Sequence, residues 1–271
     1  MADPLSAFID STRGELLRAG LTRVECDGLV WFHGGAGDET LVLVHGANDQ
    51  AGTWADVVPQ LVGRYRLILP DLPGHGESAP AEGPLPLGSM VEALDAILDA
   101  EDAPRVTLVG NSMGGWVSLL YTFAHKERVG RLVLEDSSGI AWQLDVPLFS
   151  RTREEALVAL RAVHGPDAEL GEWMIEALLA RATSSPMLRV AQAGVVEYLV
   201  DAKLPSLDVP TTLIWGRHDG VLPLAYGQSL ARRIRGATLH VIEGAAHIPH
   251  RQRPEEFLAC LTASCSANAH A

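Results

Sequence analysis

Strand-like and helical stretches alternate along most of this chain, and this alternation restricts the fold more than any other feature. Apolar runs typical of buried strands lie at 41–44, 66–70, 106–109, 131–134, 211–215 and 238–242. Helical patterns follow most of them, at 54–61, 89–99, 113–123, 224–234 and 254–261. Strands that alternate with helices at this spacing predict an α/β fold with a mainly parallel sheet covered by helices on both faces.

The first part of the chain has a different pattern. Residues 5–19 have amphipathic helical spacing, and two strand-like stretches, 23–26 and 29–32, come next. These stretches flank Asp27-Gly28, a dipeptide that favours a tight hairpin turn. We therefore predict a helix and an antiparallel hairpin before the alternating region.

The interval 139–206 contains three helical patterns and no convincing strand. Thr152 with Glu155 predicts a capping box, Asp167 is a candidate cap for the second helix, and Ser185-Pro186 favours the start of the third. The interval is too long for a plain loop. We predict a core domain formed by residues 1–138 and 207–271, with residues 139–206 as a helical cap insertion.

Composition and charge exclude several functions. The 271 residues carry a net charge of −13, whereas nucleic-acid binding needs a basic surface. The three cysteines lack the spacing of a metal site, and no apolar stretch reaches the roughly 18 residues that cross a bilayer. The N-terminus lacks the pattern of a signal peptide. We expect a cytoplasmic protein with reduced cysteines, no metal, and neither nucleic acid nor membrane as a partner.

The stretch Gly110-Asn111-Ser112-Met113-Gly114 matches the G-x-S-x-G pattern between a predicted strand and a predicted helix. Small residues around Ser112 let its backbone adopt a strained turn that exposes the hydroxyl group. A strand–helix joint that needs glycine only for packing is the alternative. The flanking strand and helix favour a nucleophile.

Ala47 follows His45-Gly46 at the end of the strand-like run 41–44. The glycine lets the backbone turn so that the Ala47 N–H points toward Ser112. Together with the N–H of Met113, it would form an oxyanion hole with two donors. We expect the His45 side chain itself to bond within its loop.

Asp219 and His247 each follow a later strand-like run, so we expect both at the same sheet edge as Ser112. A serine hydroxyl needs a base within hydrogen-bond reach, and that base needs an acid that orients it. We predict Ser112 as nucleophile, His247 as base and Asp219 as acid.

Other residues remain as alternatives for two of these roles. His250 is the alternative base, and Glu135 or Asp136 is the alternative acid, because both follow the strand-like run 131–134. We expect Asp71 and His75 to brace a turn.

Five ordered motifs together resemble the α/β-hydrolase superfamily. They are His45-Gly46, the 71–78 stretch DLPGHGES, the 110–115 stretch GNSMGG, the 216–219 stretch GRHD and Ala246-His247. The resemblance covers nearly the whole chain. It implies an eight-stranded, mostly parallel sheet flanked by helices, a helical cap inserted after strand six, and no cofactor. Haloalkane dehalogenases and epoxide hydrolases of this fold carry an aspartate where this chain has Ser112.

Within the superfamily, the 110–115 stretch is similar to that of the meta-cleavage-product hydrolases, which cleave carbon–carbon bonds. This resemblance implies a substrate-binding role for Asn111 and an arginine in the cap, for which Arg189 is the candidate. The chain departs from those enzymes at 47–50, which are not rich in serine and glycine, and just after His247, where they tend to have a tryptophan and this chain has Ile248-Pro249-His250. Residues 246–257 are more similar to carboxylesterases that act on small esters.

We therefore predict a serine hydrolase that cleaves a small, apolar carboxylic ester through an acyl-enzyme on Ser112. Its partner would be this small-molecule ester. Side chains of the cap are expected to line an apolar pocket, with Trp142, Leu148, Leu160, Trp173 and Met174 as candidates. The alternatives are a carbon–carbon hydrolase of the meta-cleavage-product type and a ligand-binding protein that keeps the fold without catalysis.

Overall fold

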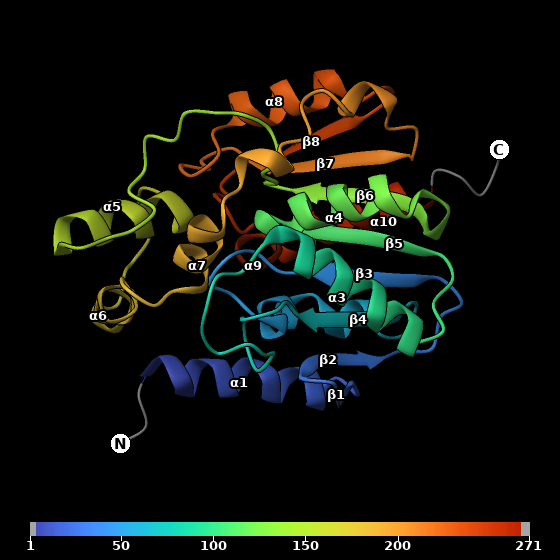
Figure 1. The fold of residues 1–271 in the computed structure, drawn as a ribbon, viewed down its shortest axis with the longest axis horizontal. Coiled ribbons are helices and arrows are strands. Elements are labelled where there is room, and N and C mark those ends of the chain that lie inside the picture. Colours follow the sequence, from blue (N-terminus) through green and yellow to red (C-terminus); the bar gives the residue numbers. More distant parts are fainter. Residues whose placement is uncertain (1–3, 267–271) are drawn as a thin grey trace.

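The structure is a computed structural model that describes residues 4–266, and its centre is an eight-stranded sheet (Figure 1). The strand order is β1-β2-β4-β3-β5-β6-β7-β8. The strands are β1 (Thr22–Cys26), β2 (Leu29–Gly34), β3 (Thr40–Val44), β4 (Arg66–Asp71), β5 (Val106–Asn111), β6 (Val129–Glu135), β7 (Thr211–Gly216) and β8 (Thr238–Ile242). All the strands predicted from the sequence are present.

Pairing is antiparallel from β1 to β2 and from β2 to β4, and parallel from β4 across to β8. The hairpin turn between β1 and β2 has positive φ at Asp27 (51°) and Gly28 (78°), as a two-residue hairpin loop requires. Strands β3, β5 and β7 are buried along their whole length. This burial explains why they read as continuous apolar runs, and the predicted eight-stranded, mostly parallel sheet is confirmed.

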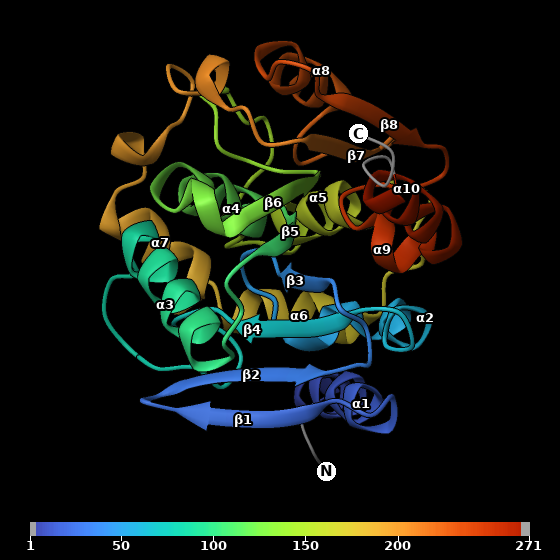
Figure 2. The same cartoon turned by 90° about the vertical axis from the view of Figure 1, so that its right-hand side faces the viewer.

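Helices cover both faces of the sheet (Figure 2). One face packs against α3 (Leu87–Ala100), α4 (Met113–Ala124) and α8 (Leu224–Arg233). The other face packs against α1 (Pro4–Arg18), the 3₁₀ helix η1 (Ala51–Asp56), α2 (Val58–Leu61) and α10 (Pro254–Ser266). Shorter turns complete the core, namely η2 (Lys126–Arg128), α9 (Pro249–Gln252) and η4 (Leu204–Ser206).

A helical region follows β6 and lies at the edge of the sheet (Figure 1). It contains α5 (Arg153–His164), α6 (Glu172–Ala180), α7 (Pro186–Ala193) and η3 (Val196–Tyr198). Thr152 forms the predicted capping box, and Ser185 caps α7. The cap predicted at Asp167 is wrong, because α6 starts at Glu172 with Gly171 before it. The division into a core and a cap domain at residues 139–206 stays a prediction.

Loops that follow the parallel strands meet at one edge of the sheet. The loop after β3 carries Ala47, the turn after β5 carries Ser112, and the loop after β8 carries His247. Since all parallel strands run in the same direction, their carboxyl ends place these loops side by side, beneath the helices α5 to α7. None of the helices within residues 4–266 is long and apolar enough to cross a membrane.

Candidate active site

Ser112 occupies a strained turn between β5 and α4. Its backbone has φ 53° and ψ −117°, a conformation that side chains rarely adopt. A Cβ at Gly114 would lie 2.2 Å from the Val44 carbonyl oxygen, and one at Gly110 would lie 2.5 Å from the Gly114 carbonyl oxygen. Glycine is therefore required at both positions for α4 to start against the sheet, which explains the G-x-S-x-G spacing.

Ser112, His247 and Asp219 form one chain of hydrogen-bonded side chains. The Nε2 atom of His247 lies 2.9 Å from Ser112 Oγ, and its Nδ1 atom lies 2.9 Å from Asp219 Oδ2. The other oxygen of Asp219 accepts hydrogen bonds from the backbone N–H groups of Val221, at 2.8 Å, and Leu222, at 2.9 Å. These bonds fix the carboxylate, which in turn orients the imidazole toward the serine.

The two predicted oxyanion donors lie on either side of Ser112 in the fold. Met113 is the first residue of α4, and Ala47 lines the cavity in front of the serine. Within residues 4–266, neither N–H donates to another group of the chain. A developing oxyanion needs free N–H donors, and Met113 supplies one at a helix start while Ala47 supplies one from the loop after β3. The oxyanion role of both residues stays a prediction.

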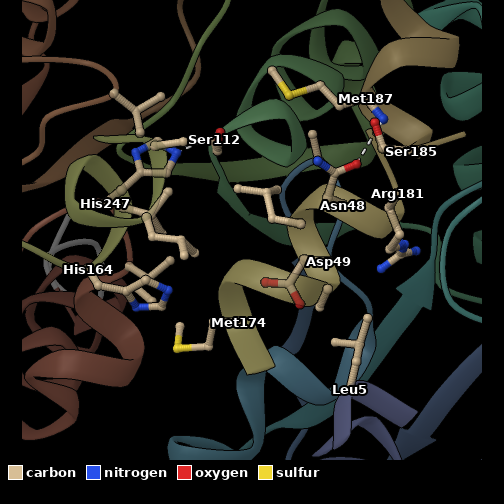
Figure 3. A pocket seen from close by; sticks show the side chains of 18 of the residues that line it. Leu5, Asn48, Asp49, Ser112, His164, Met174, Arg181, Ser185, Met187 and His247 are labelled. Carbon is tan, nitrogen blue, oxygen red and sulfur yellow. Dashed lines mark hydrogen bonds between the residues drawn. The ribbon is translucent and has the colours of Figure 1, made fainter. Parts of the chain in front are cut away.

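A cavity of about 520 Å³ opens in front of Ser112 and His247 (Figure 3). Its walls are mostly apolar. Four of the predicted lining residues are present in these walls, namely Leu148, Leu160, Trp173 and Met174. The sequence reasoning missed a further wall, which α1 supplies with Leu5, Phe8 and Ile9. The amphipathic pattern of α1 predicted its helix but not which distant segment its apolar face would contact.

Helix α1 is held in this position by polar and aromatic contacts. Arg13 pairs with the buried Asp71 at 2.8 Å and with Glu77 at 3.1 Å. Further along the helix, the ring of Phe8 lies 5.7 Å from the ring of Trp173 of α6. The first helix of the chain therefore supplies one wall of the cavity through Leu5, Phe8 and Ile9.

Charged side chains also line the cavity. Arg181, directly after α6, faces it from the side opposite His247 (Figure 3), and has no ion-pair partner among residues 4–266. Arg251 lies over the ring of Phe8 at 5.0 Å and approaches Asp56 at 3.7 Å. Burial, together with the charge of Arg251, lowers the pKa of His164 to about 4, so this histidine is neutral at pH 7.

Three predicted substrate-binding residues lie elsewhere. Arg189 is buried, and its guanidinium donates to the carbonyl groups of Gly83 (2.7 Å) and Pro80 (2.8 Å), so it holds a loop. Trp142 is 42% exposed and packs against Tyr226. Neither lines the cavity. Both side chains instead reach partners outside the cavity, so nothing in the geometry supports the substrate-binding prediction for these two.

Asn111 is also buried rather than exposed to the cavity. Its Nδ2 atom donates to the His247 carbonyl oxygen at 3.1 Å. The contact ties the turn at Ser112 to the loop that carries the histidine. Asn111 therefore holds the turn at Ser112 against the histidine loop, and it is not among the residues that line the cavity, so its substrate-binding role stays a prediction.

The alternative base and acid contact each other rather than Ser112. His250 Nδ1 lies 2.8 Å from Glu135 Oε2, and its Nε2 atom lies 3.0 Å from Thr53 Oγ1. Both His250 and Glu135 are fully buried. As expected, His45 bonds within its own region: Nδ1 is 2.7 Å from the Gly46 carbonyl oxygen, and Nε2 accepts from Leu72 N–H.

Asp136, the other alternative acid, lies against Asp219. One oxygen of each carboxyl group and a ring nitrogen of His247 all lie within 4.8 Å of one another. Burial and the charge of Asp219 raise the pKa of Asp136 well above its usual range. Asp136 therefore contacts the predicted acid rather than the base.

Comparison with known proteins identifies a family. Residues 41–259 match the sequence model described as the alpha/beta hydrolase family. A curated relative from Cupriavidus pinatubonensis, 2-hydroxy-6-oxononadienedioate/2-hydroxy-6-oxononatrienedioate hydrolase, is 30% identical over 249 residues. The match covers 82% of this chain and 85% of the relative.

Solved structures of similar fold include enzymes that act on esters. A bacterial membrane phospholipase A is 28% identical, with a TM-score of 0.79, and the match covers 97% of this chain and 93% of that one. Carboxylesterase CesB from Bacillus subtilis has a TM-score of 0.79 at 16% identity, with coverage of 96% and 98%. At this identity the second likeness concerns the fold alone.

Proposed function

Since the chain belongs to the alpha/beta hydrolase family, we propose that it is a serine hydrolase whose substrate combines an apolar body with an anionic group. The observation that carries this proposal is the hydrogen-bonded chain of Ser112, His247 and Asp219, which opens onto a largely apolar cavity. In such a chain the imidazole accepts the serine proton as the hydroxyl attacks a carbonyl group. An acyl-enzyme then forms on Ser112.

The reaction requires each group in turn. Ser112 Oγ bonds to the substrate carbonyl carbon, and its proton moves to His247. The N–H groups of Ala47 and Met113 bind the resulting oxyanion, a contribution of typically ~3 kcal/mol per donor. The leaving group takes the proton from His247. His247 then takes a proton from a water molecule, and the resulting hydroxide bonds to the acyl carbon. The bond between that carbon and Ser112 Oγ breaks, the acid leaves, and His247 returns the proton to Ser112 Oγ.

Arg181 is the reason for proposing that the substrate carries an anionic group. It is a half-buried guanidinium that lines the cavity and has no ion pair with a residue of the 4–266 segment. A charge held in such surroundings is stabilised by an opposite charge, and arginine suits carboxylate and phosphate groups because of its two parallel N–H donors. We therefore assign to Arg181 the role of the substrate-binding cap arginine, for which Arg189 was the candidate from the sequence.

We propose a carbon–carbon bond as the first candidate for the bond that the protein cleaves. The curated relative from Cupriavidus acts on dienedioates, which carry carboxylates, and Arg181 would face one of them. In this reaction the leaving group is a carbon atom whose negative charge spreads onto a neighbouring carbonyl group until His247 returns the proton. The acyl part leaves as a carboxylic acid.

Ester hydrolysis is the second candidate, and specific observations favour it. Ile248 lines the cavity directly after His247, where the carbon–carbon hydrolases tend to have tryptophan, and α1 extends the apolar wall. The phospholipase A of similar fold also supports an ester. The same atoms would act, with an alkoxide oxygen as leaving group in place of carbon.

A substrate panel separates the two candidates. Purified protein is given a 2-hydroxy-6-oxo-dienoate, whose cleavage is followed by loss of its dienolate absorbance, and p-nitrophenyl esters of graded acyl length. We expect kcat/KM for the dienoate to exceed that for the esters. The reverse order would assign the ester reaction, and turnover of both at undiminished rate by Ser112→Ala would overturn the proposal itself.

The role of Arg181 has its own test. Arg181→Met should raise KM for a carboxylate-bearing substrate by about ten- to hundredfold, the loss expected for a hydrogen bond between charged groups. A neutral p-nitrophenyl ester is the matched control, because its KM should change little. An equal effect on both substrates would mean that Arg181 shapes the cavity and does not recognise charge.

A further inference from the structure

Two carboxyl groups lie together behind the imidazole of His247, and the proposed reaction uses only one of them. Asp219 contacts the imidazole, while Asp136, directly after β6, brings a carboxyl oxygen within 4.8 Å of an oxygen of Asp219. Asp136 is fully buried, and only 5% of Asp219 is exposed. Neighbouring buried carboxylates cannot both hold a negative charge near pH 7, since each disfavours the ionisation of the other.

The hydrogen-bond partners decide which of the two is ionised. Asp219 accepts bonds from the N–H groups of Val221 and Leu222 and lies against His247 Nδ1. Asp136 accepts from one N–H group, that of Gly216, at 3.1 Å. A carboxylate with more donors is the more stable anion. The hydrogen bonds therefore favour the negative charge on Asp219 and the proton on Asp136.

We propose that Asp136 is a positioning residue that stays protonated at neutral pH and donates its hydroxyl hydrogen to Asp219. The inference rests on the proposed function, because it assigns Asp219 to the catalytic chain. Burial, the charge of Asp219 and that of the adjacent Glu135 all raise the pKa of Asp136. His247 also faces this pair, with a ring nitrogen within 4.8 Å of an oxygen of each carboxyl group.

The donated bond has two consequences for His247. It holds Asp219 in the orientation in which Oδ2 meets the imidazole. It also draws charge away from that oxygen, so Asp219 attracts the proton of an imidazolium less strongly. The histidine then returns its proton to the leaving group more readily. During the reaction the proton of Asp136 stays on Asp136.

Two variants separate a donor from an ionised acid. Asp136→Asn keeps an N–H donor toward Asp219 and tolerates the φ of 41° at this position, as asparagine does in the left-handed region. Asp136→Gly removes the donor and is also unstrained at this φ. The measured quantity is the rate at which a fluorophosphonate labels Ser112 across pH, which reports nucleophilicity without a known substrate.

We expect Asp136→Asn to lower the labelling rate by no more than about threefold, and Asp136→Gly to lower it by about ten- to hundredfold. In Asp136→Gly the midpoint of the acidic limb should move up by about half a unit to one unit, because Asp219 then stabilises the imidazolium more strongly. If Asp136→Asn were as inactive as Asp219→Asn, Asp136 would be an ionised acid. An unchanged profile in Asp136→Gly would also overturn the proposal.

A spectroscopic measurement tests the proton itself, whether or not the protein labels. The infrared difference spectrum between the wild type and Asp136→Asn at pH 7 should contain the carbonyl band of a protonated carboxyl group in the wild type. Absence of this band overturns the inference. Absence of labelling in the wild type, with the band present, would overturn the proposed function and leave the protonated pair standing.

Discussion

Two buried histidines, three residues apart in the sequence, make nearly the same contacts. His247 lies between Asp219, at 2.9 Å, and the hydroxyl group of Ser112, at 2.9 Å. His250 lies between Glu135, at 2.8 Å, and the hydroxyl group of Thr53, at 3.0 Å. Each is therefore a hydroxyl–imidazole–carboxylate chain, and distances alone do not distinguish the two.

Access to a substrate distinguishes them. Ser112 lines the cavity at the start of a helix, beside two free N–H groups. Thr53 is 2% exposed, and the ring of Trp54 covers His250 at a centroid distance of 4.2 Å. A carbonyl group therefore cannot reach Thr53, which does not line the cavity. The comparison teaches that a catalytic chain is defined by what surrounds its hydroxyl group as much as by its own hydrogen bonds.

The largest effect expected from this comparison concerns the two hydroxyl groups. Ser112→Ala should reduce kcat by about 10⁶-fold, the scale at which a lost serine nucleophile acts. Thr53→Val should leave kcat within about threefold, but it leaves the Nε2 atom of His250 without a partner and lowers the free energy of unfolding by about 1–3 kcal/mol. Ester or dienoate turnover and urea unfolding measure the two quantities. Comparable loss of kcat in both variants would remove the distinction.

Replacing the two carboxylates, Asp219 and Glu135, should also affect kcat unequally, but by a smaller factor than replacing the two hydroxyl groups. Asp219→Asn favours the wrong tautomer of His247, and comparable changes in serine proteases cost about 10⁴-fold in kcat. Glu135→Gln keeps an acceptor for the backbone N–H of His250 but removes the charge of a buried pair, so the free energy of unfolding should fall by about 3 kcal/mol. We expect its kcat to change by less than about tenfold. A Glu135→Gln enzyme as slow as Asp219→Asn would show that the buried pair takes part in the reaction.

The sequence predicted the parts of this comparison that depend on local pattern. Strand β8 begins and ends where predicted, and Ser112 lies at the predicted strand–helix joint. Chain order placed Asp219 and His247 at the same sheet edge, because parallel strands all end there. The choice of His247 over His250 agrees with the structure, since only His247 contacts Ser112.

The parts that the sequence missed depend on contacts between distant segments. Arg189 has helical spacing that indicates α7, but nothing local indicates that the carbonyl groups of residues 80 and 83 lie within its reach. In the same way, the apolar face of α1 predicts burial without naming the cavity. No sequence pattern indicates Arg181, because its proposed role depends on a cavity that only the fold creates and on the lack of an ion-pair partner among residues 4–266.

A third buried histidine shows what the carboxylates contribute to the other two. His75 is 1% exposed, its Nδ1 donates to the Pro73 carbonyl oxygen at 3.0 Å, and its Nε2 atom has no partner within the described residues. Burial is the main cause that lowers the pKa of His75 to about 3, and the nearby His45 contributes a smaller effect in the same direction. No carboxylate of the described residues pairs with this ring to offset the cost of charging it.

The lowered pKa of His75 makes the free energy of unfolding depend on pH. The unfolded chain protonates His75 near its ordinary pKa of 6.5, whereas the folded chain does so only near 3. Stability from this group is complete above pH 6.5 and is lost as the pH falls toward 3, by up to about 5 kcal/mol.

His75→Asn keeps a donor for Pro73 without a titrating ring. The unfolding free energy of this variant, measured in urea between pH 6.5 and 4, should fall less steeply than that of the wild type, by about 1.4 kcal/mol per pH unit at most. Parallel curves for the two proteins would mean that His75 gains its proton in the folded state as readily as in the unfolded one, and that burial without a carboxylate does not suffice to keep a histidine neutral here.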